Sequence, residues 1–177
     1  MITQKQLKSK LSYSPIVGVF EWRTAGRRIT QGGLAGGVCR DSGYVVIGVM
    51  GKNYLAHHLA WLYMTGDWPE MDIDHKDGDR SNNAFSNLRL ATKRQNQWNK
   101  AISPLNSSGE KGVSFDKSTQ KWRGQVGLGD KRIHVGLFKT KEEAAAAVRE
   151  RRQELHGEFA NHGQHKYVIE EMQNELL

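Results

Sequence analysis

Residues Asp72 to Asp79 read Asp-Ile-Asp-His-Lys-Asp-Gly-Asp, and the rest of the chain is organised around them. This stretch places a carboxylate, Asp74, beside an imidazole, His75, directly before a run of turn-forming residues. Asn87 stands 12 positions after His75, and Asn96 stands 9 positions after Asn87. This order supplies a base with oxygen ligands on either side of it. It predicts a metal-dependent site that cleaves phosphodiester bonds.

Local signals predict a hairpin followed by a helix. Ile73 and the segment from Leu88 to Leu90 carry the apolar residues of two short strands, and the loop between them is rich in turn formers. Thr92 and Gln95 have the spacing of a capping box, which predicts the start of a helix that contains Asn96. A hairpin packed on such a helix can bring the carboxylate and the amide to one ion.

These residues resemble the ββα-metal finger of the HNH endonucleases, with the spacing of the phage homing-endonuclease branch. The resemblance implies that Asp74 and Asn96 are metal ligands and that His75 is the general base. It also implies that Asn87 pins the loop and keeps the base oriented. Many members have a third His where this chain has Asn96, so the chain is an H-N-N variant. One carboxylate and one amide leave most positions on the ion to water and phosphate, which favours Mg²⁺, with Mn²⁺ as the alternative.

Two other ion sites fit this stretch poorly. A calcium loop with Gly78 at its required glycine would begin at Ile73 and end at Ala84, where carboxylates are needed. A structural zinc site needs paired Cys or His ligands, and Cys39 is the single cysteine. A solvated Asp-Gly-Asp turn is the plainest alternative, but it would leave the two later asparagines unexplained.

Composition limits the class of protein. A chain of 177 residues with 37% hydrophobic residues suits one medium domain or two small ones. One cysteine excludes a disulfide framework and favours a reducing, cytoplasmic setting, which is the host cytoplasm if a phage encodes the chain. The first ten residues lack an apolar signal core, and no apolar run approaches the length of a membrane span, so we expect no membrane partner.

Charge predicts an anionic partner. The formal net charge is +7 and the pI is about 9.6. Residues 93 to 152 hold 14 Lys and Arg against 6 Asp and Glu, and this segment also carries the aromatic residues of the predicted strands. Basic residues placed in this way neutralise phosphates, so we expect double-stranded DNA as the partner. The sequence implies no protein partner and leaves open whether a monomer or a dimer acts on DNA.

Residues 1 to 70 predict a β-rich lead-in to the finger. Leu7, Leu11 and Tyr13 favour a short helix that ends near Pro15. Strands are predicted over residues 18–22, 44–49 and 54–56. The glycine-rich segment over residues 32–37 predicts a structural turn, because it lacks the Lys-Ser/Thr of a nucleotide-binding loop.

A helix is predicted from His57 to Thr65, with Gly66 at its end. Phage HNH proteins usually read His-Arg-Leu here, whereas this chain has His57-His58-Leu59. Adjacent helical residues point about 100° apart, so these two imidazoles would not chelate one ion together. For His57 the alternatives are packing or hydrogen bonding behind the site, and DNA contact or support of the site. For His58 a phosphate contact would depend on pH.

The predicted fold class is α+β: a ββα-metal finger domain plus a three-stranded antiparallel sheet with one packed helix. We expect the HNH domain and its lead-in to cover residues 1–100, a linker 101–109, a second module 110–163 and a tail 164–177. Three strands are predicted over residues 111–116, 121–128 and 131–138. A capping box at Thr140 and Glu143 starts a helix that runs to about His156. Residues 166 to 177 have the apolar spacing of a short amphipathic helix.

The second module resembles the Apetala/ethylene-response-factor DNA-binding domain. The matching stretches are Lys111 to Phe115, Lys121 to Gln125, Arg132 to Phe138, Thr140 to Ala145 and Gly157 to Ala160. The resemblance implies that the sheet enters the major groove of DNA. The candidate DNA contacts are Lys117, Lys121, Arg123, Gln125, Arg132 and His134, together with Lys93 and Arg94 near the finger. Trp122 is a core residue or a sugar contact, and the sequence does not decide between them.

Together these features predict a two-module DNA endonuclease, and the resemblance to the HNH family implies a phage or mobile-element role of the homing type. Because one finger cuts one strand at a time, a monomer would nick DNA. Two alternatives stay open: a site-tolerant defence or packaging nuclease, and a catalytically silent, sequence-specific DNA-binding regulator.

Overall fold

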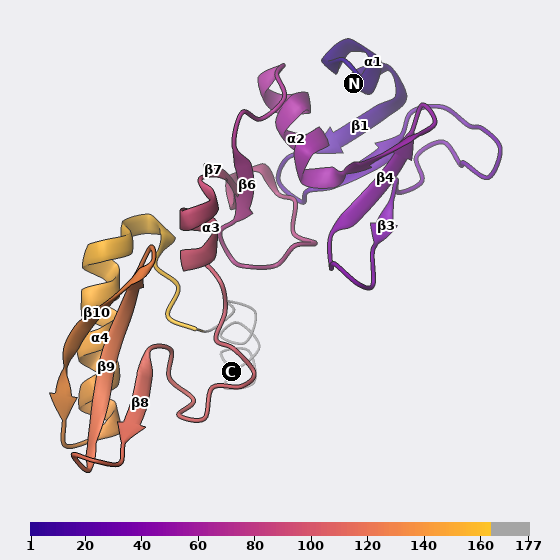
Figure 1. The fold of residues 1–177 in the computed structure, drawn as a ribbon. Helices are drawn as coiled ribbons and strands as arrows, with labels where there is room; N and C mark the ends of the chain where they lie inside the picture. The colour runs from indigo at the N-terminus through magenta and orange to yellow at the C-terminus, as the bar shows by residue number, and fades with distance from the viewer. Residues whose placement is uncertain (164–177) are drawn as a thin grey trace, which may run out of the picture. The chain divides into compact units, whose positions relative to one another are not determined.

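Small antiparallel sheets joined by short helices make up the computed structural model, which describes residues 1–163 (Figure 1). This is the α+β class that the sequence predicts. The chain divides into two compact units between Ala91 and Thr92, and each has its own core. Within residues 1–163, no helix is long and apolar enough to cross a membrane.

The first unit contains, in order, α1 (Gln4–Lys10), β1 (Leu11–Ser14), β2 (Val19–Trp22), β3 (Gly37–Val38), β4 (Val45–Val49), β5 (Lys52–Leu55), α2 (Ala56–Thr65), β6 (Asp72–His75), η1 (Phe85–Asn87) and β7 (Leu88–Ala91). The described part of the second unit contains α3 (Lys93–Trp98), β8 (Val113–Asp116), β9 (Lys121–Leu128), β10 (Lys131–Phe138), α4 (Lys141–His156) and η2 (Gly157–Phe159).

The predicted N-terminal helix is shorter than expected. Helix α1 ends at Lys10, and Leu11 and Tyr13 lie in β1, where they pair with Trp22 and Phe20 of β2. The prediction of one helix up to Pro15 is therefore wrong. The spacing from Leu7 to Leu11 fits a helix, but Leu11 and Tyr13 also fit the two-residue period of a strand. The stacking of the Tyr13 and Phe20 rings at 4.6 Å favours the strand.

The middle of the first unit is a three-stranded sheet in the order β3-β4-β5, followed by α2. Gly36 has a φ of +90°, and a Cβ there would lie 2.6 Å from the carbonyl oxygen of Val46, so glycine allows the two backbones to approach. The glycine-rich segment is the structural turn that the sequence predicts. Helix α2 ends as predicted at Gly66, which adopts a left-handed conformation with a φ of 95°.

The predicted hairpin is the pair β6 and β7. The two strands are antiparallel, with Ile73 opposite Leu90 and His75 opposite Leu88. Ile73 and Leu88 are buried in the core of the first unit, which fixes the register, because a slip by one residue would turn both side chains out of it.

The second unit contains the predicted sheet in the order β10-β9-β8, with α4 packed on one face. Both predicted capping boxes are present, at Thr92 with Gln95 and at Thr140 with Glu143. Ala144, Ala145 and Val148 of α4 are buried with Val113 and Val126 of the sheet. Trp122 is partly buried against this core, on the face that α4 covers.

The division at Ala91 groups α3 with the second unit, whereas the sequence assigns this helix to the finger and predicts a boundary at residues 101–109. Within that predicted linker, Ser108 Oγ donates to the carbonyl oxygen of Val113 at 2.7 Å, and Gly109 N donates to Asn106 Oδ1 at 2.8 Å. The predicted C-terminal helix lies outside the described residues.

Candidate active site

The two central residues of the predicted site lie at the end of β6. Asp74 and His75 are adjacent, and each is only 4% exposed. Consecutive side chains of a strand point to opposite faces, so the two groups have different neighbours. Asp74 is opposite Arg89 across the hairpin, and His75 is followed at once by the loop over residues 76–84 and by η1.

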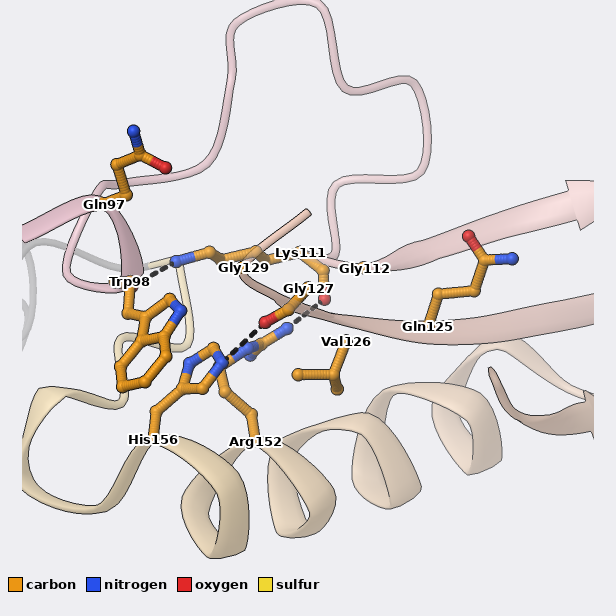
Figure 2. Close-up of a pocket in the computed structure, with 10 residues that line it drawn as sticks. All are labelled: Gln97, Trp98, Lys111, Gly112, Gln125, Val126, Gly127, Gly129, Arg152 and His156. Carbon is orange, nitrogen blue, oxygen red and sulfur yellow. Dashed lines mark hydrogen bonds between the residues drawn. The ribbon is translucent and has the colours of Figure 1, made fainter. Parts of the chain in front are cut away.

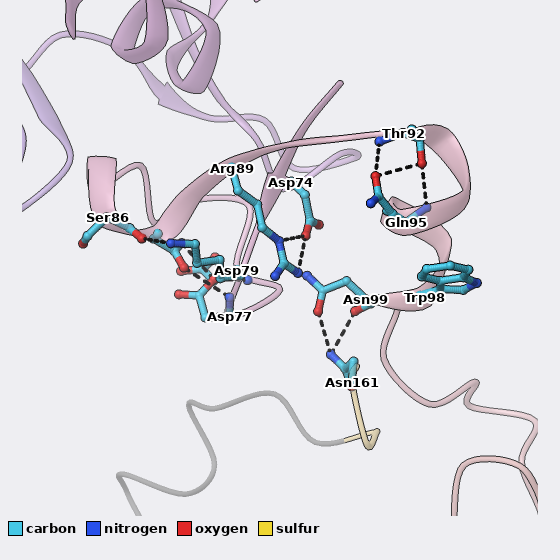
Figure 3. A network of polar contacts seen from close by, with 12 residues as sticks. Asp74, Asp77, Asp79, Ser86, Arg89, Thr92, Gln95, Trp98, Asn99 and Asn161 are labelled. Carbon is cyan, nitrogen blue, oxygen red and sulfur yellow. Dashed lines mark hydrogen bonds and ion pairs between the residues drawn. The ribbon is translucent and has the colours of Figure 1, made fainter. Parts of the chain in front are cut away.

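Asp74 forms a buried ion pair (Figure 3). Nε and Nη2 of Arg89 lie 2.8 and 2.7 Å from the same oxygen, Oδ2 of Asp74. The pair follows from the register, because β7 places Arg89 directly across from Asp74. The guanidinium neutralises part of the negative charge of Asp74, which a metal ion would otherwise neutralise.

Asn87 ties the loop after His75 together. Its Oδ1 accepts from the backbone N–H of Asp77 at 3.1 Å, and its Nδ2 donates to Oδ1 of Asp77 and to the carbonyl oxygen of Asn82. Nδ2 of Asn82 in turn donates to Oδ2 of Asp77 at 2.7 Å. These bonds tie Asp77 and Asn82 to η1 and so close the loop that follows His75.

No pattern in the sequence assigns a role to Asn83, although the structure places it against His75. Oδ1 of Asn83 lies 3.4 Å from Nε2 of His75, and the Asn83 side chain is 1% exposed. Nδ2 of Asn83 donates to the carbonyl oxygen of Ser81, which identifies Oδ1 as the atom that faces the imidazole. An acceptor there favours a proton on Nε2 and makes Nδ1 the basic nitrogen. The Asn82-Asn83 pair in a turn was the signal available in the sequence.

The N-terminal segment that contains β1 and β2 holds Asn83 in position. The Tyr13 hydroxyl donates to the carbonyl oxygen of Asn83 at 2.6 Å, and burial raises the pKa of Tyr13. Phe85 N donates to the carbonyl oxygen of Pro15 at 2.8 Å. Gly18 lies so close to the backbone of residues 83–84 that a Cβ there would be 2.1 Å from Ala84 N. The β1–β2 hairpin therefore sets the position of the loop residue that contacts His75.

Aromatic rings pack around His75. The ring centroid of His57 lies 5.0 Å from that of His75 and 5.0 Å from that of Tyr44, and the His58 ring lies 4.5 Å from His57. His57 is 3% exposed, and its Nδ1 has no hydrogen-bond partner. Burial lowers the pKa of His57 to about 3 and also lowers the pKa of His58. His57 is therefore a buried neutral ring that packs against His75.

Burial also lowers the pKa of His75, although the Asn83 contact and the nearby aspartates act in the opposite direction. A lower pKa keeps the imidazole neutral near pH 7, and a neutral imidazole can accept a proton from water.

The other predicted metal ligand, Asn96, lies on α3 and is partly buried. Within residues 1–163, no group of three or more His, Cys, Asp and Glu side chains is arranged to hold a metal ion. The predicted set contains one carboxylate and one amide, and such oxygen donors suit an ion that keeps several waters. The donor chemistry therefore fits Mg²⁺.

The predicted DNA contacts lie on or beside the second unit's sheet. Arg123 and Gln125 of β9 and Arg132 and His134 of β10 lie on the face opposite α4, with Gln125 directly across from His134. Lys121 begins β9, and Lys117 lies in the preceding turn, both exposed. On α3, Lys93 and Arg94 are exposed, and the Arg94 guanidinium lies over Gly129 in the β9–β10 turn.

One of these cations already has an acidic partner. Nη2 of Arg123 forms an ion pair with Oδ2 of Asp116. The hydroxyl of Ser118 and nearby backbone N–H groups also donate to Asp116, and these bonds lower its pKa to about 2. Asp116 therefore stays negatively charged beside the proposed DNA contact.

Comparisons with known proteins identify relatives of this chain. A family model described as HNH endonuclease matches residues 54–98, which include α2, β6, β7 and α3. Protein 3.8 of Escherichia phage T7 is 38% identical over 107 residues, which cover 59% of this chain and 86% of the phage protein. An uncharacterized HNH endonuclease of Acanthamoeba polyphaga mimivirus is 36% identical over 120 residues, which cover 67% of this chain and 62% of the viral protein.

Among solved structures, the HNH homing endonuclease I-HmuI aligns with a TM-score of 0.41 at 26% identity, over 54% of each chain. The chain thus spans less than two thirds of that protein and of the mimivirus relative, but most of T7 protein 3.8. The chain belongs to the same family as T7 protein 3.8, and residues 54–98 form an HNH endonuclease domain.

Proposed function

We propose that this chain is a metal-dependent DNA endonuclease in which His75 activates water and the second unit's sheet holds the DNA. The observation that carries the proposal is the buried Asp74-His75 pair at the end of β6, inside the segment that matches the HNH family model. Burial keeps His75 neutral near pH 7, and Asn83 orients the ring, so the imidazole is prepared to act as a base.

In this reaction His75 takes a proton from water through Nδ1. The water oxygen attacks phosphorus, the bond from phosphorus to the 3′ oxygen breaks, and the 3′ oxygen takes up a proton. The products are a 5′-phosphate and a 3′-hydroxyl. Asn83 and the ring of His57 hold the imidazole in place during this step.

HNH nucleases generally use a divalent metal ion. We propose Asp74 and Asn96 as its ligands and Mg²⁺ as the ion, with Mn²⁺ as a substitute. When bound, the ion would neutralise charge on the phosphate and on the departing oxygen. Arg89 would keep Asp74 oriented through Oδ2.

For the second unit we propose double-stranded DNA binding in the manner of an Apetala/ethylene-response-factor domain. The exposed sheet face carries Arg and Gln side chains suited to base edges, and exposed lysines flank it for phosphates. Joining a binding module to a cleaving module raises the local concentration of DNA at the site. The similarity to a T7 protein supports a phage role, and a homing role is our proposal for the biology.

The experiment that tests this function is DNA cleavage with and without Mg²⁺. The protein and its His75→Ala variant are incubated with supercoiled plasmid and with a randomised DNA library, and new ends are sequenced. We expect nicks or breaks with ligatable 5′-phosphate ends from the parent. We expect a loss of roughly 10²- to 10⁴-fold from His75→Ala at unchanged DNA affinity. If both proteins bind DNA and neither cuts it in any metal, the protein is a silent DNA-binding regulator instead.

A further inference from the structure

Helix α3 is too short to be stable without tertiary contacts. It has six residues, and none of them is buried. Isolated helices of this length are unstable in water, so tertiary contacts must hold it. Its first turn is closed by the capping box of Thr92 and Gln95 (Figure 3). Its last turn is held by contacts among four residues: Trp98 of α3 itself, and Lys111, His156 and Asn161 from other parts of the second unit. We call these four residues the α3 anchor.

Lys111 binds the chain where α3 ends. Its ammonium donates to the carbonyl oxygens of Trp98 at 3.0 Å, Lys100 at 2.6 Å and Asn161 at 2.9 Å. An ammonium has three N–H donors, and these three carbonyls use all of them. Arg152 of α4 is 2% exposed, and its Nη2 donates to the carbonyl oxygen of Lys111. The end of α3 is therefore tied to Lys111, two residues before β8, and to the segment after η2.

Trp98 packs on α4 through its ring (Figure 2). The indole of Trp98 and the imidazole of His156 are parallel within 1°, with their centroids 4.3 Å apart. His156 is 7% exposed, and its Nε2 lies 2.8 Å from the carbonyl oxygen of Gly127 in β9. The imidazole thus bridges α3 and the sheet. A pocket of about 210 Å³ lies beside this stack, lined by Trp98, Lys111, Arg152 and His156.

Asn161 completes the anchor. Its Nδ2 donates to the carbonyl oxygen of Asn99 at 2.9 Å and reaches Oδ1 of Asn99 at 3.3 Å, and both asparagines are buried. At the other end of α3, Arg94 lies against Gly129 of the β9–β10 turn, where a Cβ would be 3.1 Å from the guanidinium carbon. Contacts at both ends therefore attach α3 to the module that contains the sheet.

We infer that the α3 anchor positions Asn96 by making α3 a rigid part of the DNA-binding module. This inference rests on the proposed function, in which Asn96 is a metal ligand. Asn96 lies two residues before Trp98, so loss of the anchor frees the turn that carries it. Trp98, Lys111, His156 and Asn161 are positioning residues, and they link the place of a metal ligand to the surface that binds DNA.

The test compares the full-length parent with Trp98→Ala, which removes the stack, and with Trp98→Phe, which keeps an aromatic ring on His156. Phe138→Leu is the matched control, because it removes an aromatic ring from the core of the same module but does not touch the anchor. Two quantities are measured: hydrogen exchange of the backbone amides of residues 93–100 without metal or DNA, and the Mg²⁺ concentration for half-maximal single-turnover cleavage at saturating DNA.

In Trp98→Ala we expect exchange in residues 93–100 to accelerate and the Mg²⁺ midpoint to rise, each by ~10- to 100-fold, at unchanged DNA affinity. Trp98→Phe and Phe138→Leu should stay near the parent. The inference is overturned if Trp98→Ala leaves exchange or the Mg²⁺ midpoint at the parent value, or if Phe138→Leu changes both equally. If the parent does not cut DNA, the proposed function fails, whereas unchanged exchange in Trp98→Ala still overturns the anchor alone.

Discussion

Two nitrogens of Arg89 converge on one oxygen of Asp74, with Nε and Nη2 at 2.8 and 2.7 Å from Oδ2. The pair is almost completely buried, with side-chain exposures of 11% for Arg89 and 5% for Asp74. The proposed metal ligand therefore already carries one cationic partner. A divalent ion at Asp74 would have to share the carboxylate with the guanidinium.

Replacing this partner should change metal affinity. In Arg89→Gln, we expect the Mg²⁺ concentration for half-maximal cleavage to fall roughly fivefold, about 1 kcal/mol, because Asp74 no longer shares its charge. We also expect the free energy of unfolding without metal to fall by about 3 kcal/mol, because a buried carboxylate loses its partner. Mg²⁺ titration and urea denaturation measure the two effects. Arg80→Gln, which removes an exposed charge from the nearby loop, is the control. A higher Mg²⁺ requirement in Arg89→Gln would mean that orientation by Arg89 outweighs its charge.

Asn83 should matter for catalysis through His75. In Asn83→Ala the imidazole loses the acceptor at Nε2, so its tautomer and orientation are no longer set. We expect single-turnover cleavage to slow by ~10- to 100-fold with little change in DNA affinity. Asn82→Ala is the matched control, because it removes an amide that binds Asp77 in the same loop without touching His75. Equal losses in both variants would show that Asn83 acts only through loop stability.

Local signals were enough to predict much of the fold. The β6–β7 hairpin, the two capping boxes and the three strands of the second unit depend on residues close together in sequence, and the structure contains all of them. The spacing of Leu11 and Tyr13 fits a helix and a strand equally, and pairing with β2 decides for the strand.

The parts that the sequence did not predict depend on distant contacts. The contact of Asn83 with His75 requires the loop to fold back, and Tyr13, 70 positions away, holds it there. The attachment of α3 to the second unit depends on Lys111 and Asn161, which no local pattern connects to Trp98. The roles of Asp74, His75 and Asn96 in catalysis remain predictions from their residue types and spacing.

Asp116 should weaken DNA binding by holding Arg123. In Asp116→Asn the ion pair is lost and a negative charge leaves the proposed binding face. We expect the Kd for double-stranded DNA to fall by roughly three- to tenfold at low salt. Asp130→Asn, in the exposed β9–β10 turn, removes the same charge without releasing an arginine and should have a smaller effect. Fluorescence anisotropy at several salt concentrations measures the Kd of the parent and of both variants. No gain for Asp116→Asn over Asp130→Asn would mean that Arg123 does not contact DNA.

His57 should make stability depend on pH. Its folded-state pKa of about 3 lies below the ordinary value of 6.5, so the unfolded chain takes up a proton that the folded chain excludes. Stability is therefore lost as pH falls below 6.5, by about 2 kcal/mol at pH 5 from this residue alone. Urea denaturation at pH 7.5 and pH 5 should show a smaller loss in His57→Gln than in the parent. Equal losses in the two proteins would assign the pH dependence to the other histidines.

In the proposed reaction, Asp74 and Asn96 hold one divalent ion for water activation by His75. The most direct measurement is anomalous scattering from crystals of His75→Ala bound to uncut DNA and soaked in Mn²⁺. We predict one Mn²⁺ bonded to a carboxylate oxygen of Asp74, to the side-chain oxygen of Asn96 and to a phosphate oxygen of the DNA. Mn²⁺ bound elsewhere, with neither Asp74 nor Asn96 among its ligands, would contradict this assignment.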